Sequence, residues 1–519
     1  MVGIDYSVLE QFDYELALGR IVNDLKSDFI LSPHYSHIFK FSYEELWHRV
    51  DTDLRSGTYE PDLPITIEVP KPNGLTRPGS ILKPPDRFVF QALIDIISEE
   101  TEKLVNRDRV SSNVLLNPDY EFKMFEDHHK SWGELQDKIN TLCRDDFFTH
   151  AIKADVANYF ERLNQHYLIN LLRSSDCPSG AINLLEELLL SWTERISYGI
   201  PQGMLPSDFL GNYYLVAIDS ILEIANDPSV RYVDDLYIFF SSEANAKKGM
   251  MYLCKALREQ GLHLNELKSF IVETHKLLYE ETLLDRMFEK ARKEVEEHAL
   301  FSYSYGMQSG WPAIEDYFSE DLIELKAVEA LYKKIQEPKS PADSIERFCL
   351  PILAAAGSEI GIERALSGII QRPYLSKLYC AYLQPFMGRN PDLAVKIEKI
   401  VLKNDFICCW QLLWPIAALL NVEKVNQKTI IHILRLLQDN SLHEALRAIC
   451  AIVVGKYGSA DKKNILANQY KKEPSEYVRS AILYASQYFP TPQKRSCIKA
   501  WAGHSRINSL VALSIRKSD

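Results

Sequence analysis

Two adjacent acids interrupt an apolar, aromatic run near the middle of the chain. The run Val230–Phe240 is typical of a pair of strands, with Asp234 and Asp235 between them. A carboxylate buried in a strand is costly unless something compensates its charge. Divalent metal ions offer that compensation, because hard cations prefer carboxylate oxygens. The alternative interpretation is a tight hairpin turn that uses the two acids for its geometry alone.

A third acid, Asp155, ends the strand-like run His150–Ala154. A carboxylate at a strand end can ligate Mg²⁺ together with substrate phosphates. Neighbouring residues of a strand point to opposite faces. A turn therefore has to bring both Asp234 and Asp235 toward Asp155, or Asp234 alone joins it as a direct ligand.

An aromatic residue, Phe160, follows Asp155 five residues later. A rigid ring there could press on the 2′ position of a sugar and exclude the hydroxyl that distinguishes RNA precursors from DNA precursors. Plain core packing is the alternative, since that is what most phenylalanines do.

Two basic residues, Lys71 and Arg77, flank the turn Pro72–Gly74. The run Ile65–Val69 before the turn is strand-like, so the segment is predicted to form a β-hairpin. Both basic side chains could reach a triphosphate, and Arg77 has the fork geometry that suits phosphate. An ordinary exposed hairpin is the alternative, because basic residues are common there.

A Pro/Gly turn at Pro201–Gly203 leads into a predicted helix that Ser207 is placed to cap. Gly203, beside Gln202, lets the backbone approach a ligand such as a nucleotide base. Further along the chain, Lys268 could protonate a departing pyrophosphate. The plain alternatives are a generic entry into a helix and a surface lysine.

The elements that must position these residues follow from the patterning. Residues 1–60 have helical periodicity, and β-type and helical runs alternate between 61 and 271, which indicates an α+β unit. Residues 275–300 and everything beyond them are expected to be helical. Breaks in that helical region are predicted at Ser302–Gly306 with Gly310 and Pro312, and at Glu337–Pro341.

The last third of the chain has a faint internal repeat. Leu446 and Arg447 match Val478 and Arg479 at an offset of 32 residues. Helix pairs stacked at such a period form a solenoid with one continuous core. The period is shorter than is usual for HEAT repeats, so the prediction is a HEAT-like domain, with an irregular helical domain as the alternative.

The bulk composition limits the class of protein. A chain of 519 residues is long enough for two or three domains. No apolar run approaches the ~20 residues of a membrane helix, and the nine cysteines form no Cys-x-x-Cys pair, which fits a reducing cytosol. The net charge of −12 argues against a general duplex binder, whereas residues 451–519 carry a net +8 that could hold a polyanion or form a solvated helical face.

Taken in order, these segments resemble the finger and palm motifs of the reverse transcriptase family over about residues 61–271. The resemblance rests on Lys71–Gly74 with Arg77–Pro78 and Asp86–Arg87, on Asp155 with Phe160, on Pro201–Gly203 with Ser207 and Asn212, and on Tyr232–Asp235. The order of the segments is more specific than any one of them.

The resemblance implies nucleotide addition by two Mg²⁺ ions, with Mn²⁺ as the alternative, which clamp the attacking hydroxyl and the leaving pyrophosphate. Asp155 and Asp234 would bridge the ions. The carbonyl of Val156 would be a further ligand, and Asp235 would be a supporting acid. Lys268 keeps its expected role at the pyrophosphate.

For the substrate, the resemblance implies a deoxynucleoside triphosphate. Lys71 and Arg77 would neutralise the triphosphate. Phe160 would contact the sugar, and Gln202 and Gly203 would belong to the nucleotide-binding loop.

The predicted fold is therefore α+β: right-hand-like polymerase fingers and palm followed by an all-α, HEAT-like helical-repeat domain. The expected domains are an N-terminal helical segment (1–60), fingers and palm (61–274), a thumb-like helical connector (275–340) and the C-terminal helical-repeat domain (341–519).

A long helical region after the palm resembles the layout of the bacterial abortive-infection (Abi) and related defence reverse transcriptases. The chain lacks the retron-type Val-Thr-Gly and Asn-Ala-x-x-His signatures, and Asp208 stands where intron-encoded enzymes usually have proline. The resemblance implies a cytoplasmic bacterial homo-oligomer without membrane association. It would make single-stranded DNA without a template, attached to a protein hydroxyl, in defence against phage. The alternatives are an RNA-templated reverse transcriptase and a catalytically dead binding scaffold.

Overall fold

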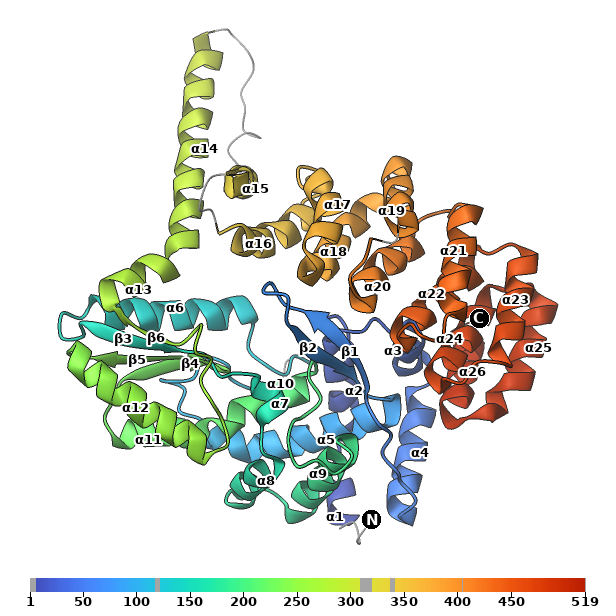
Figure 1. Cartoon of the computed structure of the whole chain (residues 1–519), viewed down its shortest axis with the longest axis horizontal. Coiled ribbons are helices and arrows are strands. Elements are labelled where there is room, and N and C mark those ends of the chain that lie inside the picture. Colours follow the sequence, from blue (N-terminus) through green and yellow to red (C-terminus); the bar gives the residue numbers. More distant parts are fainter. Residues whose placement is uncertain (1–5, 117–121, 309–319, 337–340, 404, 519) are drawn as a thin grey trace. The chain divides into compact units, whose positions relative to one another are not determined.

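The computed structural model describes residues 6–116, 122–308, 320–336, 341–403 and 405–518 (Figure 1). The chain divides into two compact units, and each is described here on its own. The first contains Met1–Glu68, Arg77–Leu278 and Tyr470–Asp519, and the second contains Val69–Thr76 and Tyr279–Gln469.

The first unit mixes helices with a small sheet, as the sequence predicts. Its N-terminal helices are α1 (Tyr6–Leu9), α2 (Tyr14–Asp24), α3 (Pro33–Phe41) and α4 (Tyr43–Ser56). Its central helices are α5 (Pro84–Thr101), α6 (His128–Arg144), α7 (Tyr159–Arg162), α8 (Gln165–Arg173), α9 (Ser179–Trp192), α10 (Leu205–Tyr214), α11 (Val216–Ile224) and α12 (Glu243–Glu259). The C-terminal segment adds α24 (Glu476–Ala485), α25 (Thr491–Trp501) and α26 (Arg506–Ser518).

A four-stranded antiparallel sheet forms the centre of this unit. Its strands are β3 (His150–Ala154), β4 (Ser229–Tyr232), β5 (Asp235–Phe240) and β6 (Phe270–Glu273), in the order β4-β5-β3-β6. The predicted strand His150–Ala154 is confirmed, and the run Val230–Phe240 is a strand pair as expected. The first predicted catalytic acid therefore follows the central strand β3, and the other two lie where β4 turns into β5.

Both faces of the sheet carry apolar side chains, because a helix packs on each face. Tyr237 and Phe239 of β5 share a buried cluster with Leu135 and Ile139 of α6. The alternating residue Phe240 faces α12 instead, where its ring lies against Gly249. Helices α6 and α12 thus lie on opposite sides of the sheet (Figure 1). This packing fixes the strand ends that hold the acids.

A separate two-stranded hairpin pairs β1 (Ile65–Pro70) with β2 (Thr76–Ile81), which confirms the predicted hairpin. At its tip the amide of Lys71 donates to the carbonyl of Leu75 at 2.7 Å. Gly74 adopts a φ of 80°, a conformation open to glycine. The tip, Val69–Thr76, falls in the second compact unit, whereas Arg77 falls in the first.

The C-terminal segment packs on the N-terminal helices within the first unit. Helix α26 contacts α3 and α24. The hydroxyl of Ser42 donates to the carbonyl of Leu510 at 3.2 Å, and Nδ1 of His37 lies 2.8 Å from Oγ of Ser514. Residues at the two ends of the sequence thus share one core.

The second unit is helical in the part that the structure describes, apart from the hairpin tip. Its helices are α13 (Thr274–Glu281, shared with the first unit), α14 (Leu283–Gln308), α15 (Glu320–Lys333), α16 (Ala342–Ala355), α17 (Ile362–Gln371), α18 (Ser376–Met387), α19 (Pro391–Lys403), α20 (Cys409–Ala418), α21 (Gln427–Gln438), α22 (Glu444–Tyr457) and α23 (Ala460–Tyr470). Helices α16, α18, α20 and α22 contact one another in succession. A C-terminal helical region is therefore present, and its description as a HEAT-like solenoid stays a prediction.

The sequence predicts two breaks in the helical region. The predicted break does not fall within Ser302–Gly306, because α14 continues through that stretch to Gln308, whereas Gly310 and Pro312 lie outside the described residues. Intrahelical hydrogen bonds outweigh a single glycine, which costs about 1 kcal/mol in a helix. The second predicted break, Glu337–Pro341, lies mostly outside the described residues, and α16 begins directly after Pro341. No helix in the described part of the chain is both long and apolar enough to cross a membrane.

Candidate active site

The turn between β4 and β5 presents the two adjacent acids. Tyr232 pairs with Asp235, which leaves Val233 and Asp234 as the two residues of the turn. Val233 has a φ of 52°, in the left-handed region that a β-branched residue rarely adopts. Such a conformation costs about 1–3 kcal/mol and persists only where its surroundings hold it. The turn is therefore built to hold Asp234 in place, which also explains how two neighbouring acids can serve one site.

The sheet register brings Asp155 to the same end as this turn. The last residue pair of β3 and β5 joins Ala154 to Leu236. One further step places Asp155 opposite Asp235, on the face that Lys153 and Tyr237 share by alternation. Asp155 and Asp235 are thus cross-strand neighbours, and Asp234 lies at the adjoining turn.

The carboxylate of Asp155 is held by the loop that precedes β6. Its Oδ1 accepts from Nζ of Lys268 at 2.9 Å, and its Oδ2 accepts from Nδ2 of Asn265 at 2.9 Å. Its backbone amide donates to the hydroxyl of Ser269 at 3.1 Å. The structure therefore joins Asp155 to Lys268, two residues that the sequence singles out separately, while Asn265 and Ser269 complete the clamp.

The three acids influence one another electrostatically. Burial, the neighbouring carboxylate of Asp235 and that of Asp155 raise the pKa of Asp234 to about 7. Burial lowers the pKa of the Lys268 ammonium, but its hydrogen bond and attraction to Asp155 outweigh that effect, so the pKa is raised overall. Concentrated negative charge of this kind is what a divalent cation compensates.

The donor set suits a divalent metal, because carboxylate oxygens are hard ligands. Within the described residues, however, no group of three or more His, Cys, Asp or Glu side chains is close enough together to hold a metal ion as it stands. The reason is visible at Asp155, whose two oxygens are directed to Lys268 and Asn265. The assignment of Asp155, Val156, Asp234 and Asp235 as metal ligands stays a prediction.

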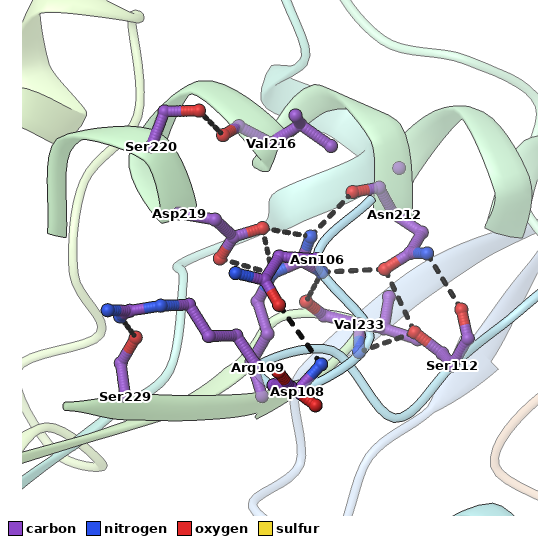
Figure 2. A network of polar contacts seen from close by, with 12 residues as sticks. Asn106, Asp108, Arg109, Ser112, Asn212, Val216, Asp219, Ser220, Ser229 and Val233 are labelled. Carbon is purple, nitrogen blue, oxygen red and sulfur yellow. Dashed lines mark hydrogen bonds and ion pairs between the residues drawn. The ribbon is translucent and has the colours of Figure 1, made fainter. Parts of the chain in front are cut away.

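A buried polar network holds the β4–β5 turn in place. Arg231 is 1% exposed and donates to both carboxylate oxygens of Asp219, at 2.6–3.0 Å. The same guanidinium donates to Oδ1 of Asn212 at 2.6 Å and to the carbonyl of Val233 at 3.0 Å. Ser112 donates to Oδ1 of Asn212 at 2.9 Å, and Figure 2 shows Asp219, Asn212, Ser112 and Val233 gathered around this point. The strained turn is therefore fixed by α10, α11 and the segment before α6.

A pocket of 560 Å³ opens beside the turn. Of the predicted site residues, Phe160, Asp234 and Asp235 line it. The other lining residues are Asn23, Asp24, Ser27, Ser112, Lys123, Met124, Phe125, Glu126, Asp127, Leu205, Asp208, Tyr232 and Val233. Several acids and a single lysine thus surround a space of a size suited to a small ligand.

Asp208 is an additional acid at this pocket. It is half-buried in the first turn of α10, and burial together with Asp24 and Asp234 raises its pKa to about 8, against an opposing effect of Arg77. The sequence shows Asp208 only as a departure from a family pattern. The position of Asp208 near Asp234 could not be predicted from the sequence.

Phe160 faces the pocket from α7. Its ring packs on α10, where a Cβ at Gly211 would come within 2.9 Å of it. Its neighbour Tyr159 is buried and donates to the carbonyl of Gly211. The ring of Phe160 is therefore backed by the helix, as a residue that limits the size of a ligand would be.

Gln202 and Gly203 lie in the loop before α10. The carbonyl of Gln202 accepts from the amide of Ser80 in β2 at 2.8 Å, and Gly203 has a φ of 107°. The guanidinium of Arg77 lies over the ring of Phe29, 4.6 Å from its centre. Lys71 belongs to the hairpin tip in the second unit, so its predicted contact with a triphosphate stays a prediction.

The predicted cap at Ser207 is wrong. Helix α10 begins at Leu205, its N-cap residue is Met204, and Ser207 already lies in the first turn. Pro206 is compatible with an earlier start, because proline is tolerated in the first turn of a helix. The amide of Leu205 donates instead to the carboxylate of Asp24 at 3.1 Å, a cap from a distant segment that local patterning could not reveal.

Residues 69–294, which are under half of the chain, match the sequence model of the family described as reverse transcriptase (RNA-dependent DNA polymerase). No curated protein matches the chain. Among solved structures, the chain is similar to an apo telomerase from Candida tropicalis, with 12% sequence identity and a TM-score of 0.31 over 91% of this chain and 74% of that chain. The family match identifies residues 69–294 as a reverse-transcriptase domain, which is a domain of the nucleotidyltransferase and polymerase type.

Proposed function

We propose that this protein is a DNA polymerase that adds deoxynucleotides at a two-metal site built on Asp155, Asp234 and Asp235. The observation that supports this most directly is that these acids lie at one end of the sheet, where burial, Asp235 and Asp155 raise the pKa of Asp234 to about 7. A single cation shared among carboxylates removes such repulsion. The role of the site is thus inferred from its charge as well as from its motifs.

The charge of the pocket also supports metal-dependent nucleotide binding. The lining acids Asp24, Glu126, Asp127, Asp208, Asp234 and Asp235 outnumber Lys123, the one lysine among the lining residues. A triphosphate would be repelled by this surface unless cations accompanied it. Mg²⁺ ions, or Mn²⁺ in their place, would polarise the phosphates and stabilise the attacking and leaving oxygens when bound.

The residues of the chain have separate tasks in this proposal. Asp155 and the carbonyl of Val156 would hold a metal ion, which would supply charge compensation at the phosphates. The ammonium of Lys268, which lies beside Asp155, is the proton donor for the departing pyrophosphate. Arg77 and Lys71 neutralise the triphosphate, as charge stabilisation supplies most of the catalysis in phosphoryl transfer.

Selection of the sugar is assigned to Phe160. Its ring lines the pocket together with Asp234 and is backed by Gly211 of α10. Because the ring has no room to move away from the pocket, it would clash with a 2′-hydroxyl. Gln202 and Gly203 complete the site as the nucleotide-binding loop.

The finer parts of the proposal concern template and primer. We propose synthesis without a nucleic-acid template, started on a protein hydroxyl, by a homo-oligomer in the bacterial cytoplasm that defends against phage. The resemblance to the Abi layout and the acidic charge of the chain, −12 overall, support this choice. The basic residues Lys494, Arg495 and Lys499 on α25 would hold the single-stranded product.

One experiment tests these statements together. Purified protein is incubated with Mg²⁺ and labelled deoxynucleotides without template or primer, with Asp234→Asn and a chelator as controls. We expect label that stays on the protein in denaturant and is removed by nuclease. Incorporation only after RNA is added would refute untemplated synthesis but keep the polymerase. No incorporation under either condition would leave the dead scaffold as the better description.

A further inference from the structure

The N-terminal helical segment forms part of the pocket wall, although it lies outside the residues 69–294 that match the reverse transcriptase family. Asn23, Asp24 and Ser27, at and just after the end of α2, line the same pocket as Asp234. The family resemblance assigns nothing to these residues. The pocket therefore contains residues that the matched family region does not include.

The segment is firmly anchored where it meets the pocket. The buried guanidinium of Arg87 donates to Asp24 at 2.8 Å and to both oxygens of Asp28 at 2.7 and 2.8 Å. Asp24 also accepts from the amide of Leu205, the first residue of α10. Removing one partner of such a buried pair is strongly destabilising. The residue that follows Asp28 is thus held in a fixed place.

That residue, Phe29, contacts two of the predicted nucleotide-binding residues at once. The guanidinium carbon of Arg77 lies 4.6 Å from the centre of its ring. A Cβ added at Gly203 would lie 2.4 Å from Cδ2 of the same ring. Phe29 therefore covers the backbone of Gly203 and offers a flat face to Arg77. The family motifs include neither contact.

We propose that Phe29 is a positioning residue for nucleotide binding, acting through Arg77 and the loop at Gly203. This inference rests on the proposed function and specifies which part of the chain orients the triphosphate-binding arginine. An arginine stacked on an aromatic face loses less freedom when it binds phosphate, because its planar fork is already oriented. The ring also prevents the Gln202–Gly203 loop from collapsing into the space beside it.

The test compares steady-state deoxynucleotide incorporation by Phe29 variants under the conditions in which the wild-type protein is active. Phe29→Ala is expected to raise KM for the nucleotide about tenfold and to change kcat less than about twofold. Phe29→Tyr restores the wild-type KM because it keeps the ring. Phe29→Leu, which keeps apolar cover on Gly203 without a ring face, falls between the two.

Phe41→Ala is the matched control. Phe41 is also half-buried, lies in the N-terminal segment and has a cation over its ring, with Nζ of Lys40 at 5.1 Å from the centre. The double variant Phe29→Ala with Arg77→Ala should lose less nucleotide affinity than the two single losses combined, because part of the effect of Phe29 acts through Arg77 and only the part at Gly203 is independent. Equal KM values for Phe29→Ala and Phe41→Ala, or full additivity in the double variant, would overturn the inference.

Two further measurements keep the outcomes separate. Thermal melting is recorded for each variant, and if Phe29→Ala is unfolded at the assay temperature, the same criteria are applied to Phe29→Leu. Equilibrium binding of a fluorescent deoxynucleotide in Ca²⁺ reports affinity without turnover. If the wild-type protein binds the probe but incorporates nothing, the polymerase proposal fails, and weaker binding by Phe29→Ala still supports the role of Phe29. If the wild-type protein does not bind the probe, both fail.

Discussion

At the level of single residues, Asp234 bears the electrostatic cost of the site. Burial, Asp235 and Asp155 raise the pKa of its carboxyl from 3.8 to about 7. The folded protein therefore binds this proton more tightly than the unfolded chain does. In the absence of metal, stability is consequently lost as the pH rises from 3.8 to about 7, and the loss is complete above that range.

Asp234→Asn should remove this loss along with the activity. In a chelator at pH 8, we expect the variant to melt at a higher temperature than the wild-type protein. The free energy of unfolding should be larger by about 1–3 kcal/mol after allowance for solvent screening. The difference should vanish near pH 4, and added Mg²⁺ should reduce it at pH 8. Melting curves at several pH values measure it. Asp137→Asn, at an exposed position of α6, is the control, and an equal shift there would contradict the assignment.

Phe160→Ala should relax discrimination between sugars. With the ring gone, a 2′-hydroxyl no longer meets a wall backed by Gly211, so incorporation of ribonucleotides should rise relative to deoxynucleotides by roughly ten- to hundredfold. Competition assays with both nucleotide types measure the ratio. Phe148→Ala, half-buried just before the other end of β3, should leave the ratio unchanged. An unchanged ratio in Phe160→Ala would remove the steric role.

At the level of elements, the β4–β5 turn depends on residues outside the hairpin. Arg231 holds Val233 in its left-handed conformation. Its guanidinium donates hydrogen bonds to Asp219, to Asn212 and to the carbonyl of Val233. The geometry of Asp234 is thus set by α10 and α11 as much as by its own strands.

Arg231→Lys should therefore damage the site although it keeps the charge. A lysine cannot reproduce the planar fork, so several buried acceptors lose their donor, at an expected cost of about 2–4 kcal/mol in stability. Incorporation should fall by at least about tenfold, because the turn can relax. Arg109→Lys is the control. Arg109 donates to the hydroxyl of Ser229 at the far end of β4, as Figure 2 shows, and its replacement should leave kcat near the wild-type value.

The elements differ in how far the sequence could predict them. The strand at His150–Ala154 follows from its apolar run, and the hairpin at Lys71–Gly74 follows from its turn residues, because both signals are local. The predicted cap of α10 at Ser207 is wrong, since the amide of Leu205 donates to Asp24, a residue far away in the chain. The contacts of Asp155 with Lys268 and Asn265 likewise depend on sheet topology, which a sequence pattern does not contain.

At the level of the whole molecule, the two ends of the chain share one core. Leu510 of α26 is 1% exposed, and the helix packs on α3, whose residues Tyr35, Ile38 and Phe39 are buried. Arg506 of the same helix pairs with Asp53 but is 67% exposed at its side chain. The apolar residue should therefore matter far more than the ion pair.

Leu510→Ala should lower the free energy of unfolding by about 2–4 kcal/mol, because it leaves a cavity between α26 and α3. Arg506→Ala is the paired control and should change it by less than about 1 kcal/mol, as exposed ion pairs contribute little. Chemical denaturation of both variants measures the difference. Equal changes in the free energy of unfolding for the two variants would show that the interface between α26 and α3 is not an apolar core.

The stability of the region around α3 should also depend on acid. Burial lowers the pKa of His34 from 6.5 to about 3, and burial together with Lys40 lowers that of His37 to about 4. The unfolded chain binds these protons first, so stability falls as the pH drops below 6.5, by up to about 1.4 kcal/mol per pH unit for each histidine. His34→Phe should flatten the melting temperature between pH 6.5 and pH 4.5, and a slope equal to that of the wild-type protein would contradict this.

The contact between Ser32 and Tyr477 joins residues 445 positions apart. During synthesis, α3 leaves the ribosome hundreds of residues before α24 and α26, so the part of its surface that these two helices cover stays exposed for most of translation. Loop closure over such a span is slow, and exposed apolar surface favours aggregation meanwhile. We therefore expect recombinant yield to depend strongly on chaperones and on growth temperature. A truncated chain limited to residues 69–294 would lack both halves of this late-closing core.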